Sequence, residues 1–162
     1  MTDIVRPAVA ADAAGIHIVH RVSWLETYSH LVDPAVIERR YADAELWRAR
    51  WLGLIANGVV SVAERDARVV GWAYAVTGRT GDGPRDRELE GIYLLAEAHG
   101  SGLGQALLDA VIGDAPAFLW VADRNPRAEA FYRRNRFERD GATDQHRVGP
   151  GGETLTAVRM VR

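Results

Sequence analysis

The sequence contains no cysteine and no lysine. The absence of cysteine excludes a disulfide framework, a covalent thiol intermediate and a thiolate metal site. A Walker-type phosphate loop needs a lysine followed by serine or threonine, so this loop is excluded as well. All 20 basic residues are arginines, and a phosphate-binding side chain must therefore be arginine or histidine.

Long apolar runs and an excess of charge of one sign are also missing. No apolar run approaches the roughly 20 residues that a membrane span needs, and no basic and then apolar leader opens the sequence. The formal net charge of −2 gives no reason to expect binding to nucleic acid or to an anionic membrane. We therefore expect a cytoplasmic protein without nucleic-acid or membrane partners.

The length suits one domain. With 162 residues, of which 48% are hydrophobic, the chain can close a substantial core by itself. The sequence has no internal repeat and no linker that could divide it. We therefore predict a single domain over residues 1–162.

Residues 88–111 combine a strand, a glycine-rich turn and a helix. Residues 88–95 suit a strand, and apolar residues repeat at helical spacing over residues 103–111. Such a junction concentrates unpaired backbone N–H groups and the positive end of the helix dipole, and glycines let an anion approach them. This stretch is therefore predicted to bind phosphate. A glycine-rich turn without a ligand is the alternative.

The spacing of the glycines narrows the type of phosphate loop. Gly100, Gly102 and Gly104 alternate, whereas a Rossmann fingerprint would need its third glycine at the position of Gln105. The remaining pattern, HGSGLG after the strand IYLL, resembles the Gln/Arg-x-x-Gly-x-Gly/Ala pyrophosphate loop of the GNAT superfamily, the acyl-CoA-dependent N-acetyltransferases. His99 stands where that family usually carries glutamine or arginine.

Two further segments are similar to this family. Residues 125–137 read NPRAEAFYRRNRF and resemble the family's Asn-x-x-Ala-x-x-Phe-Tyr-x-x-x-Gly-Phe segment, with Arg136 in place of the usual glycine. Residues 22–34 read VSWLETYSHLVDP and look like a helix-to-loop segment of one branch of small bacterial members. The resemblance spans essentially the whole chain.

Periodicity and turn signals predict the element order β-ααα-ββ-β-α-β-α-β-β. This order favours an α/β fold with a mixed, mostly antiparallel central sheet flanked by helices, which the resemblance also implies. The predicted strands are residues 3–6, a hairpin over 59–78 that turns at 65–67, and residues 88–95, 117–121, 137–140 and 154–161. The predicted helices follow the caps Asp12, Asp33, Asp43 and Asn125 or cover residues 103–111. Residues 78–87 and 141–153 are predicted to be loops, the first of them mobile.

The first helix has an aliphatic stripe and an aromatic face. Its apolar spacing predicts a core stripe of Gly15, Ile18, Val22 and Leu25. The residues off this stripe are His20, Arg21, Trp24 and Tyr28. A polar and aromatic face of this kind is typical of a solvated or partly packed surface.

The resemblance implies acetyl-CoA as a co-substrate and assigns residues to it. The pantetheine arm would lie along the strand at Ile92, Tyr93 and Leu94, with the thioester carbonyl held by a main-chain N–H near Leu94. The pyrophosphate would sit on the loop formed by His99, Gly100, Ser101, Gly102, Leu103, Gly104 and Gln105. Asn125 would meet the arm, although its position before Pro126 equally suits a helix N-cap. No metal is expected.

Tyr132 matches the family's tyrosine beside the thioester sulfur, where it would also contact the cofactor. A phenol, whose pKa is ordinarily about 10, is protonated at neutral pH and can give its proton to a thiolate, whose conjugate acid has a pKa near about 8.5. We therefore predict that Tyr132 is the general acid. The alternative is a packing role beside Phe131.

Glu88 and Glu90 alternate along one strand and are predicted to share a face. The resemblance aligns Glu88 with a glutamate that serves as the base in some branches of the family, and a solvated pair at a sheet edge is the alternative. The acceptor groove in this superfamily is built from the first helices and the C-terminal loop. Those segments offer Trp24, Glu26, Tyr28 and His146 for contact with the substrate.

These features together predict an enzyme, an acyltransferase that moves the acetyl group of acetyl-CoA to a primary amine by direct attack in a ternary complex. The acceptor would be a small molecule or a peptide amine, and a homodimer is a family-level expectation. A non-catalytic acyl-CoA-binding or sensor module is the alternative from another class. The glycine spacing disfavours a nicotinamide-dependent enzyme.

Overall fold

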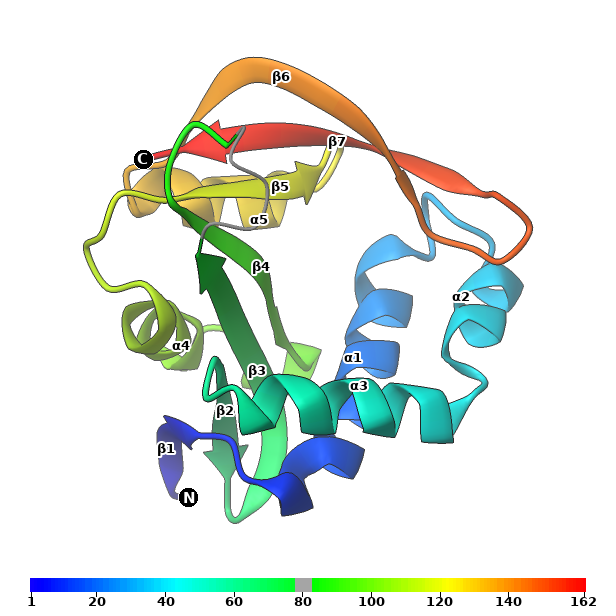
Figure 1. Ribbon diagram of the computed structural model, residues 1–162, viewed down its shortest axis with the longest axis vertical. Helices are drawn as coiled ribbons and strands as arrows, with labels where there is room; N and C mark the ends of the chain where they lie inside the picture. Colours follow the sequence, from blue (N-terminus) through cyan, green and yellow to red (C-terminus); the bar gives the residue numbers. More distant parts are fainter. Residues whose placement is uncertain (78–82) are drawn as a thin grey trace.

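The computed structural model describes residues 1–77 and 83–162 (Figure 1). The order of strands and α-helices is the predicted one, with short 3-10 helices added at Ala10–Asp12 and Ala96–Ala98. Part of the loop predicted to be mobile, residues 78–82, lies outside the described residues. Residues 83–86 form a bend that leads into the next strand.

The strands are β1 (Asp3–Pro7), β2 (Val60–Arg65), β3 (Arg68–Thr77), β4 (Arg87–Leu94), β5 (Phe118–Ala122), β6 (Glu138–Arg147) and β7 (Thr154–Val161). The α-helices are α1 (Ala13–Tyr28), α2 (Pro34–Tyr41), α3 (Ala44–Ala56), α4 (Leu103–Val111) and α5 (Pro126–Arg134). The side chains of Asp33, Asp43 and Asn125 cap α2, α3 and α5, as predicted. Asp12 precedes α1, but its carboxylate is bound by the guanidinium of Arg6 and caps no helical N–H.

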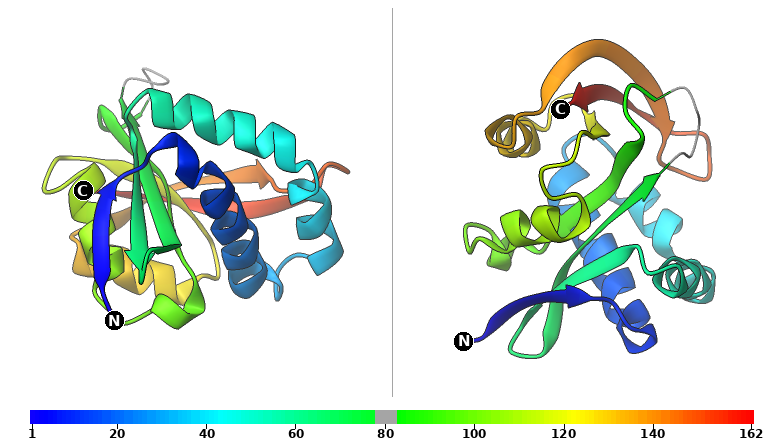
Figure 2. Two further views of the ribbon diagram at one scale, coloured as in Figure 1. Left: turned by 90° about the horizontal axis from the view of Figure 1, so that it is seen from below. Right: turned by 60° about the vertical axis from the view of Figure 1, so that its left-hand side comes forward.

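The strands form one seven-stranded sheet in the order β1-β2-β3-β4-β5-β7-β6. Every described neighbouring pair is antiparallel except β4 and β5, which are parallel. Figure 2 shows α1, α2 and α3 on one side of the sheet and α4 and α5 on the other. The fold is therefore the mixed, mostly antiparallel α/β layout that the element order predicts.

The hairpin and the helix after the glycine-rich turn are confirmed. Asp66 and Ala67 both have positive φ angles, of 49° and 63°, which is the backbone of a tight two-residue hairpin turn between β2 and β3. The apolar stripe predicted for α4 is buried, and it consists of Leu103, Leu107, Leu108 and Val111. This stripe holds the glycine-rich turn against the sheet.

The predicted core stripe of α1 is wrong. Ile18 is 58% exposed, whereas the off-stripe residues His20, Trp24 and Tyr28 are all buried. The buried side of α1 carries Ile16 and Val19, which pack in the main core, and then His20, Trp24 and Tyr28, which meet rings such as that of Trp72 on β3. The predicted stripe therefore lies beside the buried side, which combines aliphatic and aromatic residues.

His20 lies at the centre of this aromatic core. Its ring centroid is 4.8 to 6.1 Å from six other rings, those of Trp24, Tyr41, Trp47, Trp51, Trp72 and Tyr93. Burial, and then the charge of Arg40, holds the pKa of His20 well below its ordinary value of 6.5. The imidazole is therefore neutral at physiological pH.

The buried His20 predicts a loss of stability in mild acid. Between about pH 7.5 and about pH 5 the unfolded chain takes up a proton at this residue and the folded chain does not, so the free energy of unfolding falls as the pH is lowered. His20→Phe keeps a ring in the cluster and removes the titrating group. We expect the slope of the free energy of unfolding against pH, measured by chemical denaturation, to decrease by up to about 1.4 kcal/mol per pH unit.

The exposed His30 provides the control for this measurement. His17, whose pKa is lowered by burial and by Arg21, remains in all variants and contributes a common background. His30→Gln should keep the native slope. Equal slopes for the native chain and His20→Phe would show that burial does not keep His20 neutral.

The loop predicted at residues 141–153 is wrong in its first half. β6 extends to Arg147 and pairs with β7, with a register shift between Arg139 and Thr143 where Gly141 has a φ of 92°. β6 is an edge strand with mostly exposed residues, so it lacks the apolar alternation from which a strand is predicted. His146 accordingly lies on a strand and not in a loop.

Candidate active site

The strands β4 and β5 separate in the middle of the sheet. They pair only at Glu88 with Phe118 and at Leu89 with Leu119, and then they diverge (Figure 1). On its other side β4 stays paired with β3 as far as Leu94. The edge of β4 that faces β5 therefore pairs with no strand of the described chain over residues 91–94. An extended ligand can pair with main-chain groups there as a strand would.

An irregularity in β4 accompanies this separation. Leu89 lies opposite Ala75 and Gly91 lies opposite Tyr74, so Glu90 is an extra residue of β4 in the register with β3. The prediction that Glu88 and Glu90 share a face assumed unbroken alternation along the strand. The extra residue interrupts that alternation. The common face of the two glutamates therefore no longer follows from their spacing.

The glycine-rich turn has the geometry of an anion site. Gly100 and Gly102 have φ angles of 76° and 89°, and Gly102 immediately precedes α4. The N–H groups without a hydrogen bond to the described chain are those of Gly100, Ser101, Gly102, Gly104 and Gln105. They gather at the positive end of the α4 dipole, where a phosphate is stabilised.

The three alternating glycines have different roles. A Cβ atom at Gly100 or Gly102 would meet no atom of the chain, so their positive φ angles are what requires glycine. A Cβ atom at Gly104 would lie 3.2 Å from the side chain of Leu94. Gly100 and Gly102 shape the turn, and Gly104 lets α4 approach β4 closely.

Side chains hold the turn in place. Ser101 donates a hydrogen bond to the carbonyl of Ala98 at 2.7 Å, and Glu26 of α1 accepts one from the N–H of Ala96 at 2.9 Å. Nε2 of His99 is 3.0 Å from the carbonyl oxygen of Leu94. Burial, and then the charge of Arg127, lowers the pKa of His99, so a neutral imidazole donates this bond. In this conformation the hydrogen bond from His99 to Leu94 stabilises the glycine-rich turn.

Residues from three elements meet beside the open edge of β4. The hydroxyls of Tyr28 and Tyr93 are 3.0 Å apart, and the side chain of Asn125 faces Tyr28. Asn125 also caps α5, since its Oδ1 accepts the N–H of Ala128 at 3.2 Å. Its capping role is thus confirmed, while contact with the cofactor stays a prediction. The bond between Tyr28 and Tyr93 was not predicted, because the side chains are 65 positions apart in the sequence.

Tyr132 adds a hydroxyl that the protein leaves unused. The residue is 7% exposed, and burial, and then the neighbouring Tyr28, raises its pKa above the ordinary value of 10. Within the described chain its hydroxyl has no hydrogen-bond partner, and it is not among the polar atoms that are sealed from solvent. Tyr132 is therefore a protonated donor that is available to a ligand.

The sheet register brings Glu88 and His146 to one face. Glu88 of β4 lies opposite Phe118 of β5, so their side chains are on the same face of the sheet. Trp120 is two residues further along β5 and therefore shares this face. Trp120 lies opposite Arg159 of β7, and the same alternation extends this face to His146 of β6. The rings of Trp120 and His146 are 5.4 Å apart. Alternation within residues 117–121 could have indicated Trp120, but only the pairing with β7 shows what it faces.

Trp24 and Tyr28 are less accessible than substrate-binding residues were expected to be. Both are buried in a second apolar cluster that includes α2 and Val148, and their rings are 4.8 Å apart. The hydroxyl of Tyr28 lies beside that of Tyr93 and close enough to Tyr132 to affect its pKa. Trp24 lies one helical turn earlier in α1. Their contact with a substrate remains a prediction.

The structure describes residues 1–77 and 83–162, and two further observations concern these residues. No three histidine, aspartate or glutamate side chains in this part of the chain gather as a metal site. No helix within residues 1–77 or 83–162 is long and apolar enough to cross a membrane.

Comparisons with known sequences agree with this geometry. The model of the acetyltransferase (GNAT) family matches residues 17–137. The chain is 32% identical over 134 residues to an uncharacterized N-acetyltransferase, Rv2669 of Mycobacterium tuberculosis, covering 76% of this chain and 83% of that protein. It is also 32% identical over 130 residues to an uncharacterized N-acetyltransferase, YuaI of Bacillus subtilis, covering 75% and 73%.

Solved structures share the fold. The putative acetyltransferase yncA of Salmonella typhimurium, solved with acetyl-CoA, has a TM-score of 0.71 and 24% identity and covers 100% of this chain and 94% of that one. A phosphinothricin acetyltransferase of Sinorhizobium meliloti, solved with acetyl-CoA, has a TM-score of 0.69 and 28% identity and covers 100% and 88%. The chain therefore belongs to the acetyltransferase (GNAT) family and is an acyltransferase.

Proposed function

We propose that this enzyme transfers the acetyl group of acetyl-CoA to a primary amine by direct attack in a ternary complex. The observation that carries the proposal is the open edge of β4, which ends in a turn of unpaired N–H groups and lies beside the unused hydroxyl of Tyr132. Two similar structures contain acetyl-CoA, which supports this cofactor.

In this proposal each part of acetyl-CoA has a place on the described residues. The pyrophosphate binds the N–H groups between Gly100 and Gln105, and the pantetheine arm pairs with β4 at Ile92, Tyr93 and Leu94. A main-chain N–H near Leu94 holds the thioester carbonyl and stabilises the charge that develops on its oxygen.

In the transfer step the amine nitrogen attacks the thioester carbon. The new C–N bond forms, the C–S bond breaks, and the electron pair leaves with the sulfur. Tyr132 gives its proton to this sulfur, and a base takes one proton from the amine. The burial that raises the pKa of Tyr132 also disfavours a thiolate, so both groups favour transfer of the proton to sulfur.

A steady-state assay of CoA release over a panel of amines and peptides tests the proposal. Direct attack in a ternary complex predicts that double-reciprocal lines intersect and that no acetyl-enzyme accumulates. Binding of acetyl-CoA without amine-dependent release of CoA would instead identify a non-catalytic binding module. Parallel lines with a burst of CoA would contradict direct attack.

Gly102→Val should weaken acetyl-CoA binding by at least about tenfold, measured by calorimetry, because a side chain there forces the turn out of its positive φ and blocks close approach of the phosphate. Gly58→Val is the matched control. Gly58 also has a positive φ, of 70°, with open space around its Cβ position, but it ends α3. Both variants should lose similar stability, about 1 to 2 kcal/mol. Native affinity in Gly102→Val would show that the turn is not the pyrophosphate site.

A further inference from the structure

Arg40, at the end of α2, is a guanidinium without a counter-charge in an aromatic setting. Its central carbon lies 4.6 Å from the centre of the Trp24 ring and 5.7 Å from those of Tyr41 and Trp47. The residue is half-buried, and no carboxylate of the described chain forms an ion pair with it. Stacking on rings offsets part of the cost of removing such a charge from water, but only an anion neutralises it.

The nitrogen atoms of Arg40 show what remains available. Nη1 donates to the carbonyl oxygens of Arg147, the last residue of β6, and Val148, in the turn that follows, at 3.4 and 3.3 Å. Nε is buried without a partner. Nη2 makes no hydrogen bond to the described chain and is not sealed from solvent. The side chain of Arg40 is thus held in place by Nη1, while Nη2 is accessible to a ligand.

The polar atoms next to the Arg40 side chain are the two carbonyl oxygens that Nη1 uses and two groups contributed by the rings. The indole nitrogen of Trp24 and the hydroxyl of Tyr41 are also buried without a partner, and the indole nitrogen can only donate. Since these atoms are sealed from solvent, the donor that a ligand can reach is Nη2 of Arg40, and its positive charge favours an anion. A carboxylate oxygen can accept a charge-assisted hydrogen bond from Nη2.

Contacts between rings connect Arg40 to the reaction centre. Arg40 lies on Trp24, the Trp24 ring packs against Tyr28, and the Tyr28 hydroxyl meets that of Tyr93 on β4. Tyr28 in turn acts on the pKa of Tyr132. A molecule bound beside this row would have an anionic end at Arg40, an apolar body along the rings, and an amine toward the open edge of β4.

We propose that Arg40 binds a carboxylate of the acceptor, so that the preferred substrate is an amine that carries a carboxylate on an apolar body. This inference rests on the proposed function and names the acceptor class that Trp24 and Tyr28 did not identify. It also assigns a substrate-binding residue outside those predicted from the sequence.

The test compares amino acids with their methyl esters as acceptors, including a series of ω-amino acids of increasing length. Binding by a charge-assisted pair predicts that kcat/KM for the best acid exceeds that for its ester by about 10- to 100-fold. In Arg40→Gln this ratio should fall by the same factor, and in Arg40→Lys it should fall by less. Comparing ratios between variants cancels the difference in amine basicity between acid and ester.

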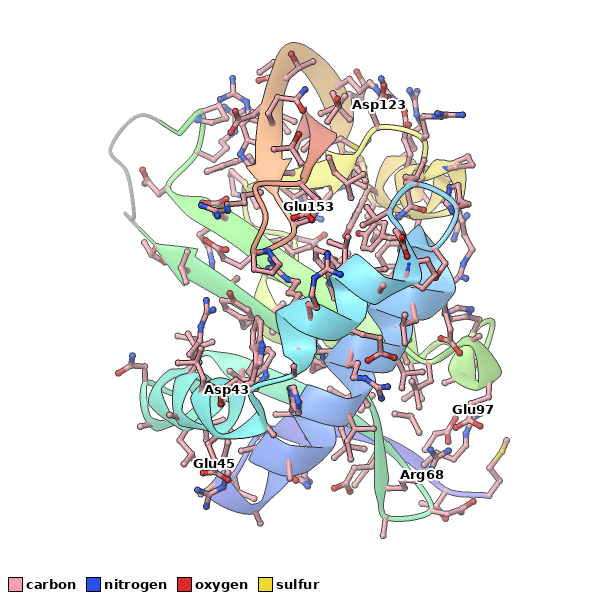
Figure 3. The ribbon with its side chains drawn as sticks, turned by 90° about the vertical axis from the view of Figure 1, so that its right-hand side faces the viewer. Asp43, Glu45, Arg68, Glu97, Asp123 and Glu153 are labelled. Carbon is pink, nitrogen blue, oxygen red and sulfur yellow. The ribbon has the colours of Figure 1, made fainter. Side chains whose placement is uncertain are left out.

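Two arginines serve as controls. Arg39 joins α2 to the same turn through Glu153 at 3.3 Å, and Figure 3 shows Glu153 in that turn. Arg50 stacks on Trp47 at 4.6 Å, as Arg40 stacks on Trp24. Arg39→Gln and Arg50→Gln should keep the native ratio of acid to ester. A ratio near one in the native enzyme for every pair, or a native ratio in Arg40→Gln, would overturn the inference.

Failure of the proposed function would be seen separately, as the absence of CoA release with every acid and every ester. Titration of the CoA complex with an N-acetyl amino acid and its methyl ester would then test Arg40 by binding alone. Tighter binding of the acid, lost in Arg40→Gln, would support the carboxylate site. Equal binding of acid and ester would overturn it.

Discussion

Replacing Tyr132 with phenylalanine is expected to lower kcat by about 10²-fold or more, which is the effect of losing a proton donor in the transition state. The phenol is buried, its pKa is raised by burial, and its hydroxyl makes no hydrogen bond to the described chain. Removal of the oxygen therefore breaks no bond within the described fold. The loss should appear in kcat, measured where chemistry limits the rate.

The melting temperature and the affinity for acetyl-CoA distinguish catalysis from packing in Tyr132→Phe. A general acid acts on the leaving thiolate, so both quantities should stay near their native values. The raised pKa also predicts that deprotonation of Tyr132 causes no decline of kcat between about pH 7 and about pH 9. An unchanged kcat would leave Tyr132 as a packing residue beside Phe131 and Phe137.

Features that depend on neighbouring residues could be predicted from the sequence. One example is the turn at Gly100 and Gly102, whose positive φ angles are favoured by glycine. Another is the apolar stripe of α4, which a short stretch of sequence shows by its helical spacing. The caps at Asp33 and Asp43 likewise depend on a side chain and an N–H two or three residues away. This is why the glycine-rich turn and the helix after it were located correctly in the chain.

Features that depend on pairing between distant residues could not be predicted. The irregularity at Glu90 arises from the register of β4 with β3. β6 is a strand because its main chain pairs with β7. The burial of His20 depends on rings contributed by α2, α3 and β3. The position of Arg40 depends on the turn between β6 and β7, more than 100 residues away. Each of these features lies in the part of the fold to which we assign the acceptor, so the acceptor was the least predictable part of the proposed function.

Glu88→Gln is the second substitution with a large expected effect. A typical primary amine is mostly protonated at neutral pH, since its pKa lies near that of lysine, about 10.4. Turnover therefore needs a group that takes a proton, directly or through water. We expect Glu88→Gln to lower kcat/KM by about 10²-fold and to remove or shift the acidic limb of its pH profile, measured with saturating acetyl-CoA.

The structure supports Glu88 over Glu90 for this role. Glu88 lies where β4 is still paired with both β3 and β5, so its position is fixed on two sides, and it shares its face with Trp120 and His146. Glu90 is the extra residue at the irregularity in the register with β3. A base must be held in register with the reacting amine, which favours the position that both neighbouring strands define.

Glu90→Gln is the matched comparison, because it removes a second carboxylate two positions away on the same strand. We expect it mainly to raise the acceptor KM and to keep the acidic limb of the pH profile, since a nearby negative charge attracts the ammonium form of the acceptor without taking its proton.

Two other outcomes would change the assignment of the base. If Glu90→Gln abolishes the acidic limb of the kcat/KM profile and Glu88→Gln does not, the irregularity has brought Glu90 to the amine and the alignment of Glu88 with the family base is wrong. If neither substitution changes the limb, the proton leaves through water or another residue. His146, on the face of Glu88, would then be the next base to test with His146→Gln.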